Sequence, residues 1–247
     1  MSITSDADWR GLKEVGRVVR LTLDTLAAHV RAGVTTGELD RLALEIFEAN
    51  DARSAPAMTY GFPGTVLISV NDEIVHGVPG RRLLKRGDIV KLDVTAEKDG
   101  YVADAARTVV LDGASQTARQ LARCAQEAFE AALAVARAGN PVNAIGKAVE
   151  STVRRYGYSV VRALEGHGVG RAIHEAPAVP NWFNVRQTDV LTDGLVITIE
   201  PLIASGAGDA YEDVDGWTIR TNDGSLAAHH EHTLVITSGD PILLTAA

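Results

Sequence analysis

The first fifty residues contain two helical patterns of apolar positions. Between residues 12 and 30, apolar residues recur every three or four positions and give one apolar face: Leu12, Val15, Val19, Leu23, Leu26 and Val30. Gly33 ends this pattern, and Thr35 with Glu38 then forms a capping-box sequence, which is typical of a helix start. A second apolar face follows at Leu39, Leu42, Ile46 and Phe47. The pattern predicts two amphipathic helices.

From about residue 65 the apolar period shortens and predicts strands in the segments TVLISV, GDIVKLDVTA and YVADAARTVVL. Two more helical faces follow, one made of Leu121, Ala125, Ala128, Phe129, Ala132 and Ala136, the other of Ile145, Val149 and Val153. Strand-like segments return at YSVVRAL, GLVITIE and HHEHTLVIT. The order of two helices followed by strands therefore occurs twice.

Two short matches support an internal duplication. The junction Arg31-Ala32-Gly33 recurs as Arg137-Ala138-Gly139, and the strand GDIVKLD (87–93) recurs as GLVITIE (194–200) at nearly the same offset. Both strands begin with glycine, continue with aliphatic residues and end in a carboxylate. No linker-like segment separates the halves. We therefore expect one α+β domain over residues 1–247, with halves at 9–111 and 115–238 around a central cleft.

Composition narrows the class of protein. With 46% hydrophobic and 23% charged residues, the chain can form a sizeable core, which argues against disorder. A net charge of −8 argues against nucleic-acid binding, which needs Lys and Arg to neutralise phosphates. Cys124 is the only cysteine and cannot form an internal disulfide. The N-terminus is polar and no apolar run is long enough to span a membrane, so we expect a soluble cytoplasmic protein without membrane partners.

Two aspartates near one turn suggest unusual chemistry. A hairpin with the four-residue loop Glu97–Gly100 would place Asp93 directly opposite Asp104, with Cβ atoms roughly 5 Å apart. Like charges facing each other destabilise a sheet unless one carboxylate is protonated or a cation binds. A solvated surface pair in a hairpin of another register is the alternative.

Three further residues favour the cation. Glu200 is the duplicate of Asp93, Glu231 lies among apolar positions, and His167 stands between glycines that allow close backbone approach. The candidate metal ligands are Asp93, Asp104, His167, Glu200 and Glu231. Four carboxylates balance two divalent ions, and this donor set suits Mn²⁺, Fe²⁺, Co²⁺ or Zn²⁺. Two such ions can bridge a water and lower its pKa, which is the chemistry of hydrolysis.

Six segments resemble the type I methionine aminopeptidases in order and spacing: NDEIVHGVP, DIVKLDV, DGYVAD, GHGVGRAIHEAP, ITIEP and EHTLVIT. The resemblance covers nearly the whole chain. It implies the pseudo-symmetric pita-bread fold, which agrees with the duplication. It also implies removal of the initiator methionine from new chains whose second residue is small, through a hydroxide bridging two divalent metal ions.

The resemblance also implies a role for each ligand. Asp93 would bind one metal, Asp104 and Glu231 would bridge both, and His167 with Glu200 would hold the other. Glu200 would also carry a proton from the bridging water to the leaving amine.

Residues outside the ligand set receive roles in the same way. His76 would hydrogen-bond the substrate near the scissile amide, and His174 would stabilise the carbonyl oxygen as it becomes anionic. The pocket for the first side chain would consist of Phe62, Leu67, Ile173 and Trp217. Bacterial relatives often have cysteine at the position of Leu67 and histidine at that of Tyr60. The remaining histidines are interpreted as packing groups or neighbours of the ligands: His29, His229, His230 and His232.

The expected partners are N-terminal Met peptides of nascent chains, which makes ribosome proximity plausible for a monomer of this kind. Two alternatives remain open. An X-Pro aminopeptidase or dipeptidase uses the same scaffold, but it usually has an extra N-terminal domain for which the residues before His76 leave no room. A non-catalytic pita-bread binding protein is the second, although such a protein would be expected to have lost some ligands.

Overall fold

The computed structural model describes residues 1–246. Its helices are α1 (Asp6–His29), α2 (Thr36–Ala49), α3 (Ala55–Tyr60), α4 (Gln116–Leu133) and α5 (Asn143–Arg155). Its longer strands are β2 (Leu67–Val70), β4 (Ile89–Lys98), β5 (Tyr101–Val110), β7 (Glu165–Gly168), β8 (Glu175–Pro180), β9 (Val196–Ile199) and β14 (Glu231–Val235). Shorter strands are β1 (Arg53–Ser54), β3 (Glu73–Val75), β6 (Ser159–Val160), β10 (Leu202–Ala204), β11 (Ala210–Glu212), β12 (Ile219–Thr221), β13 (Ala227–His229) and β15 (Ile242–Leu243).

The four helices predicted from periodicity are confirmed, and their starts follow local capping. The Ser5 hydroxyl accepts a hydrogen bond from the Asp8 backbone N–H at the start of α1. At α2, both halves of the predicted Thr35–Glu38 capping box are present. The helix α3 was not predicted. It is six residues long, and Ser54 caps it.

The main sheet has nine strands, all paired antiparallel. Its strand order is β1-β4-β5-β14-β9-β7-β8, and β2 and β15 pair with β4 and β14. Two small three-stranded sheets, β13-β10-β6 and β11-β12-β3, complete the architecture. Strand β14, from the C-terminal part of the chain, lies between β5 and β9. The two sequence halves therefore share one continuous sheet.

The β4–β5 hairpin corrects one prediction. Its turn has two central residues, Asp99 and Gly100, both with positive φ, so that Lys98 pairs with Tyr101. As a result Asp93 lies opposite Ala106, and the direct Asp93–Asp104 pair expected from a four-residue loop is wrong. Ala106 and Asp104 are two residues apart, so Asp104 still shares a face with Asp93, as its diagonal neighbour.

Backbone hydrogen bonds repeat between the halves, in line with the predicted duplication. The Gly33 N–H donates to the Leu84 carbonyl at 2.9 Å, and the Gly139 N–H donates to the Leu191 carbonyl at 2.9 Å. Gly33 and Gly139 both have φ of 93°, in the left-handed region that glycine adopts without strain. The structure thus uses the same connection after the first helix of each half.

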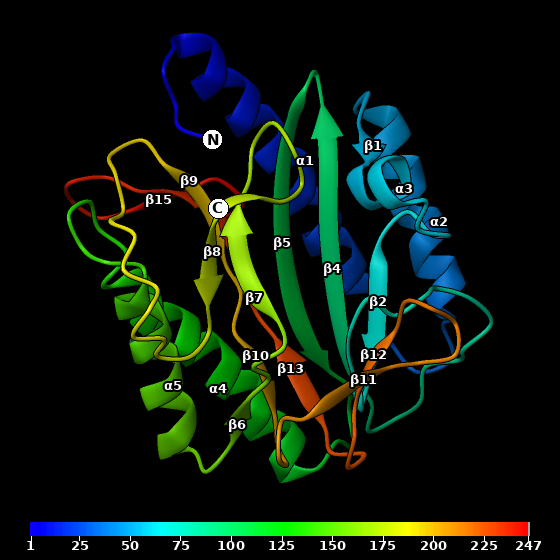
Figure 1. The fold of residues 1–247 in the computed structure, drawn as a ribbon. Helices are drawn as coiled ribbons and strands as arrows, with labels where there is room; N and C mark the ends of the chain where they lie inside the picture. Colours follow the sequence, from blue (N-terminus) through cyan, green and yellow to red (C-terminus); the bar gives the residue numbers. More distant parts are fainter. Residues whose placement is uncertain (247) are drawn as a thin grey trace.

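Two apolar clusters form the core on one side of the sheet. One joins α1 and α2 to β2, β4 and β5, and the other joins α4 and α5 to β9 and β14. In Figure 1, α1 passes behind β4 and β5, while α4 lies near β10 and β13. This arrangement leaves the opposite face of the central strands for the candidate site. Within residues 1–246, no helix is long and apolar enough to cross a membrane.

Candidate metal centre

All five predicted ligands lie in two neighbouring rows across the main sheet. Directly paired residues point to the same face, so each row presents its side chains together. Pairing, with the β14–β9 ladder continued by one residue, gives the first row as Leu67, Asp93, Ala106, Glu231 and Glu200. The second row, two residues along each strand, contains Thr95, Asp104, Thr233, Thr198 and His167. Because Ala106 is small, the first row has room for carboxylates on both sides of it.

Several carboxylate oxygens in these rows are buried without a hydrogen-bond partner. Among residues 1–246, they are Asp93 Oδ1, Asp104 Oδ1 and Glu231 Oε1. A buried, unpartnered carboxylate is costly unless a cation or a proton compensates it. No Lys or Arg lines the pocket that these residues share. Two sets of side chains bring their donor atoms within 4.8 Å of one another, namely Asp93, His229 and Glu231, and Asp104, His167 and Glu231. Oxygen donors with a few imidazoles fit divalent ions.

Without a cation, the carboxyl groups of this cluster have pKa values above those of ordinary carboxyl groups. Burial, and then the charge of Asp104, raises the pKa of Asp93, of Glu200 and of Glu231 well above the ordinary value. Burial also raises the pKa of Asp104 to about 6, although a hydrogen bond from Thr95 acts in the opposite direction. The metal-free protein therefore resists full ionisation of this cluster.

Thr198 connects two of the predicted ligands and was not identified from the sequence. Its hydroxyl accepts a hydrogen bond from the His167 backbone N–H at 3.0 Å and donates to Glu200 Oε1 at 2.9 Å. The Nε2 of His167 lies 3.5 Å from the same Glu200 oxygen. Burial lowers the pKa of His167 to about 4, which keeps its ring neutral and able to bind a metal. Thr198 stands two residues before Glu200 in a predicted strand, and this spacing could have placed both side chains on the same face.

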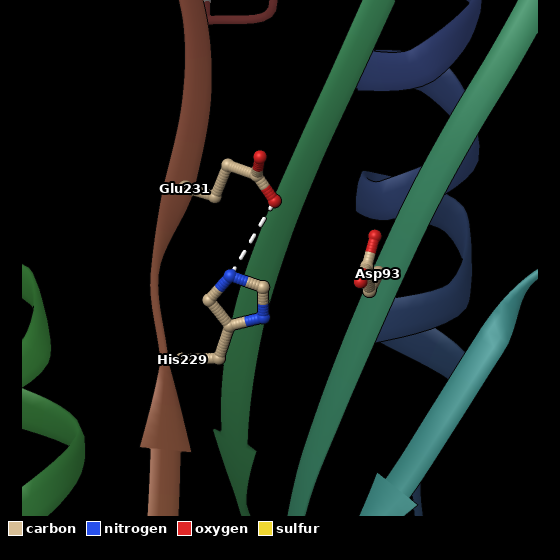
Figure 2. Close-up of side chains that lie close together, drawn as sticks. All are labelled: Asp93, His229 and Glu231. Carbon is tan, nitrogen blue, oxygen red and sulfur yellow. Dashed lines mark ion pairs between the residues drawn. The ribbon is translucent and has the colours of Figure 1, made fainter. Parts of the chain in front are cut away.

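His229, which was interpreted from the sequence as a packing group or a neighbour of the ligands, lies at the site. Its ring is 1% exposed, and Nε2 lies 3.4 Å from Glu231 Oε2. Figure 2 shows His229, Glu231 and Asp93 on the face of the sheet that points away from α1. Its interpretation as a neighbour of the ligands agrees with this position. The signal in the sequence is again the spacing of two residues before Glu231.

His76 and His174 also line the pocket. His76 follows β3 with a φ of 60°, and burial lowers its pKa to about 4. His174 stands in the exposed loop before β8, with its ring centroid 4.3 Å from that of His167. The Tyr60 hydroxyl lies 2.5 Å from His174 Nδ1, so Tyr60 leaves Nε2 of His174 free to contact a ligand. Tyr60 was noted in the sequence only as a departure from the pattern of relatives.

The predicted apolar residues form a wall next to the ligands. Phe62, Leu67, Ile173 and Trp217 all line the same pocket. Leu67 pairs directly with Asp93 between β2 and β4, so the apolar wall begins beside the first row. Phe62 and Trp217 meet edge to face, with ring centroids 5.3 Å apart. The pocket thus joins an apolar slot to an acidic cluster.

A second group of acids lies outside this pocket, with Glu73 buried and Asp72 and Asp213 half-buried, and its charges are paired within the protein. The Arg220 guanidinium donates to Asp213, to Asp72 and to Glu73. Arg82 donates to Glu73 as well. We call these five residues the arginine-paired cluster. Its acids need no added cation.

Comparisons with known proteins agree with this geometry. Residues 10–238 match metallopeptidase family M24. The chain is 39% identical over 247 residues to methionine aminopeptidase 2 of Bacillus subtilis, with 99% of each chain covered. The crystal structure of methionine aminopeptidase from Thermotoga maritima superposes with a TM-score of 0.96 at 33% identity, over the full length of both chains.

Prolidases share the fold at greater distance. The prolidase from Pyrococcus furiosus superposes with a TM-score of 0.80 at 22% identity, covering 99% of this chain and 65% of the prolidase. This likeness extends to the fold alone. Together with the Thermotoga maritima structure, it identifies the α+β architecture as the pita-bread fold expected from the sequence.

Proposed function

Because the chain belongs to metallopeptidase family M24, we propose that this hydrolase is a methionine aminopeptidase, which cleaves an N-terminal methionine from peptides whose second residue is small. The observation that carries the proposal is a cluster of buried, unpartnered carboxylates beside an apolar slot. The full-length similarity to proteins named methionine aminopeptidase supports the same reaction.

The cofactor in this proposal is a pair of divalent metal ions per chain, drawn from Co²⁺, Mn²⁺, Fe²⁺ and Zn²⁺. The residues that would hold them are Asp93, Asp104, His167, Glu200 and Glu231, with Asp104 and Glu231 shared. When bound, such ions lower the pKa of a water molecule and polarise a carbonyl group. Four carboxylates and two divalent ions balance in charge, which supports this stoichiometry.

Three side chains supply the proton and hydrogen-bond chemistry. The Glu200 carboxylate accepts a proton from the attacking water and delivers it to the departing amine. The Thr198 hydroxyl bonds Oε1 of Glu200, so it holds the carboxylate in a fixed orientation during both transfers. His174 donates from Nε2 to the substrate's carbonyl oxygen as negative charge develops there, and His76 hydrogen-bonds the substrate near the scissile amide.

The apolar slot selects the side chain to be removed. Phe62, Leu67, Ile173 and Trp217 offer contacts without a charged partner, which suits the unbranched and polarizable methionine side chain. Leucine has similar volume but branches at Cγ. Pockets of this type discriminate by roughly 10–200-fold, so kcat/KM for methionine should exceed that for leucine at least ~10-fold, while norleucine should substitute well. Assays on Met-, norleucine- and Leu-Ala-Ser peptides measure this, and equal cleavage of leucine would contradict the slot assignment.

One experiment tests the reaction as a whole. Metal analysis of the purified protein is followed by hydrolysis assays on Met-Ala-Ser and Ala-Pro, before and after exhaustive chelation. We expect cleavage of Met-Ala-Ser only, its loss on chelation, and its recovery with Co²⁺ or Mn²⁺. Cleavage of Ala-Pro in preference would support the X-Pro peptidase, and full activity with verified absence of metal would contradict metal-dependent hydrolysis.

The remaining features of the proposal concern the setting of the reaction. The substrates are N-terminal Met peptides of nascent chains, which favours a cytoplasmic protein working near the ribosome. We further propose one catalytic domain over residues 1–247 that acts as a monomer. The hydrogen bonds that recur at Gly33 and Gly139 support the division into halves at 9–111 and 115–238.

A further inference from the structure

His229 ends β13 in a fixed and fully enclosed position. Its backbone N–H donates to Thr108 Oγ1 at 2.9 Å, and the Thr108 hydroxyl donates to its carbonyl at 2.7 Å. The side chain is 1% exposed. Among the described residues 1–246, both of its ring nitrogens belong to the few buried polar atoms without a hydrogen-bond partner. Leaving a buried polar group unpaired costs about 1–3 kcal/mol, so a purely apolar side chain would fill this space at lower cost.

The imidazole faces the first row of the candidate metal centre. Nε2 lies 3.4 Å from Glu231 Oε2 and 4.0 Å from Glu200 Oε2. Figure 2 shows the ring of His229 next to the Glu231 carboxylate, with Asp93 on the neighbouring part of the sheet. The other Glu231 oxygen, Oε1, is buried and unpartnered. The two oxygens of Glu231 thus have different surroundings, since one faces His229 and the other does not.

We propose that His229 is a positioning residue of the metal centre, a role that rests on the metal-dependent function proposed above. The tautomer with its proton on Nε2 donates to Oε2 of Glu231 and holds this oxygen in place, so that Oε1 is presented to a cation. A small closing movement of the side chains brings the 3.4 Å separation into hydrogen-bond range. Hydrogen bonds to ligating carboxylates fix their orientation, and losing one typically lowers metal affinity by about 10–100-fold.

Two substitutions separate this role from simple packing. His229→Leu removes the donor and keeps an apolar side chain, whereas His229→Gln keeps an amide N–H that reaches the same carboxylate. Isothermal titration of each metal-free protein with Mn²⁺ measures affinity without reference to turnover. We expect His229→Leu to weaken Mn²⁺ binding by about 10–100-fold and His229→Gln to restore most of it. His230→Leu is the matched control, because the neighbouring His230 ring packs against Phe129 instead of the carboxylates.

Wild-type protein provides a test that needs no variant. X-ray absorption of the Co²⁺-loaded enzyme counts the imidazoles bound to metal. One imidazole per pair of ions, from His167, is the expected result, and two would make His229 a direct ligand and overturn the positioning role. Unchanged Mn²⁺ affinity in a folded His229→Leu variant would overturn it as well. Circular dichroism of each variant establishes folding, and Met-Ala-Ser hydrolysis by the wild type tests the proposed function separately.

Discussion

Two groups of acids in this protein, each with at least one buried carboxylate, have opposite surroundings. In the arginine-paired cluster, Glu73 is 6% exposed and accepts hydrogen bonds from both Arg82 and Arg220. In the metal centre, Asp104 is also 6% exposed, yet no Lys or Arg lines its pocket. The degree of burial is the same, and the difference lies in whether the fold supplies the positive charge.

That difference separates structural acids from functional ones. The Arg220 guanidinium on β12 pairs with Glu73 on β3 and stabilises the fold. Because this positive charge is permanent, Glu73 needs no bound cation. The carboxylates of the metal centre remain without such compensation, and their raised pKa values show the cost of this arrangement. Burial without an internal cation is therefore the property that marks a binding site here.

The largest effect is expected from removing one acid of the candidate metal centre. Asp104→Asn should lower kcat/KM on Met-Ala-Ser by more than about 100-fold, because a ligand matters more than the hydrogen-bond partner of a ligand. It should also reduce the rise in melting temperature that metal produces. Asp72→Asn, the matched control from the arginine-paired cluster, should leave both quantities near wild type. Wild-type turnover by Asp104→Asn would remove Asp104 from the ligand set.

Removing the Arg220 guanidinium should lower the stability of the fold and leave metal binding unchanged, which is the opposite of the effect of Asp104→Asn. Arg220→Met leaves Asp72 and Asp213 without their guanidinium and leaves Glu73 with Arg82 alone. Because Arg220, Asp72 and Asp213 are only half-buried, we expect a loss of about 1–3 kcal/mol. At about 2–4 °C per kcal/mol for a chain of this size, the upper end predicts a melting temperature lower by about 6–12 °C. Mn²⁺ affinity should stay unchanged in titrations of the same variant. A large loss of affinity would mean that the two clusters are not independent.

The pH dependence of the metal-free protein gives an effect of intermediate size. A carboxyl group whose pKa is raised in the folded state, as for Asp104 at about 6, contributes stability at low pH that is lost as pH rises. Metal-free protein should thus lose about 1 kcal/mol or more between pH 4 and pH 7, or about 2–4 °C or more in melting temperature.

Bound metal removes this penalty, so the difference in melting temperature between metal-loaded and metal-free protein should widen as pH rises. Calorimetry of both forms at several pH values measures it. Asp104→Asn should flatten the profile of the metal-free protein, since it lacks one of the titrating groups. A gap that stays constant with pH in the wild type would contradict the assignment of these acids.

The smallest effect is expected at the rim of the pocket. Tyr60→Phe removes the hydroxyl that contacts His174 and leaves the ring in place. Loss of one hydrogen bond costs about 0.5–1.5 kcal/mol, which corresponds to about 2- to 10-fold in kcat/KM. Tyr158→Phe, whose ring stacks on Tyr156 outside the pocket, is the control and should have no effect. A null result for both would leave His174 oriented without help from Tyr60.

Much of the fold was predictable from local patterns, because long elements carry many periodic positions. The β4–β5 hairpin was predicted as two strands, and only its register was wrong, since Asp99 and Gly100 take left-handed conformations that shorten the turn. The short strands β10 to β13 were largely missed. Each has only three residues, which is too short for a periodic signal, and β10 and β13 also pair across a long stretch of chain.

In the candidate site too, some residues could be predicted from local patterns and others could not. The carboxylates were predicted because they end or interrupt apolar strands, where an acid is out of place. Tyr60 contacts His174 from a distant segment, and nothing in the sequence indicates that contact. Thr198 and His229 each contact a predicted ligand two residues further along the chain. From the sequence, strand periodicity could have placed Thr198 on the same face as Glu200, and His229 on the same face as Glu231.

The first row across the sheet has a further consequence for the chain as a polymer. It joins Asp93 on β4 to Glu231 on β14, strands far apart in the sequence. A cation held by both closes a long loop, in the way that a disulfide cross-link does, and cross-linking loops of about 100 residues is worth roughly 4–5 kcal/mol in the chain-entropy account. The lone Cys124 cannot provide such a cross-link within the chain. An ion bound by the proposed ligands Asp93 and Glu231 would therefore act as a reversible cross-link, which chelation removes and metal binding restores.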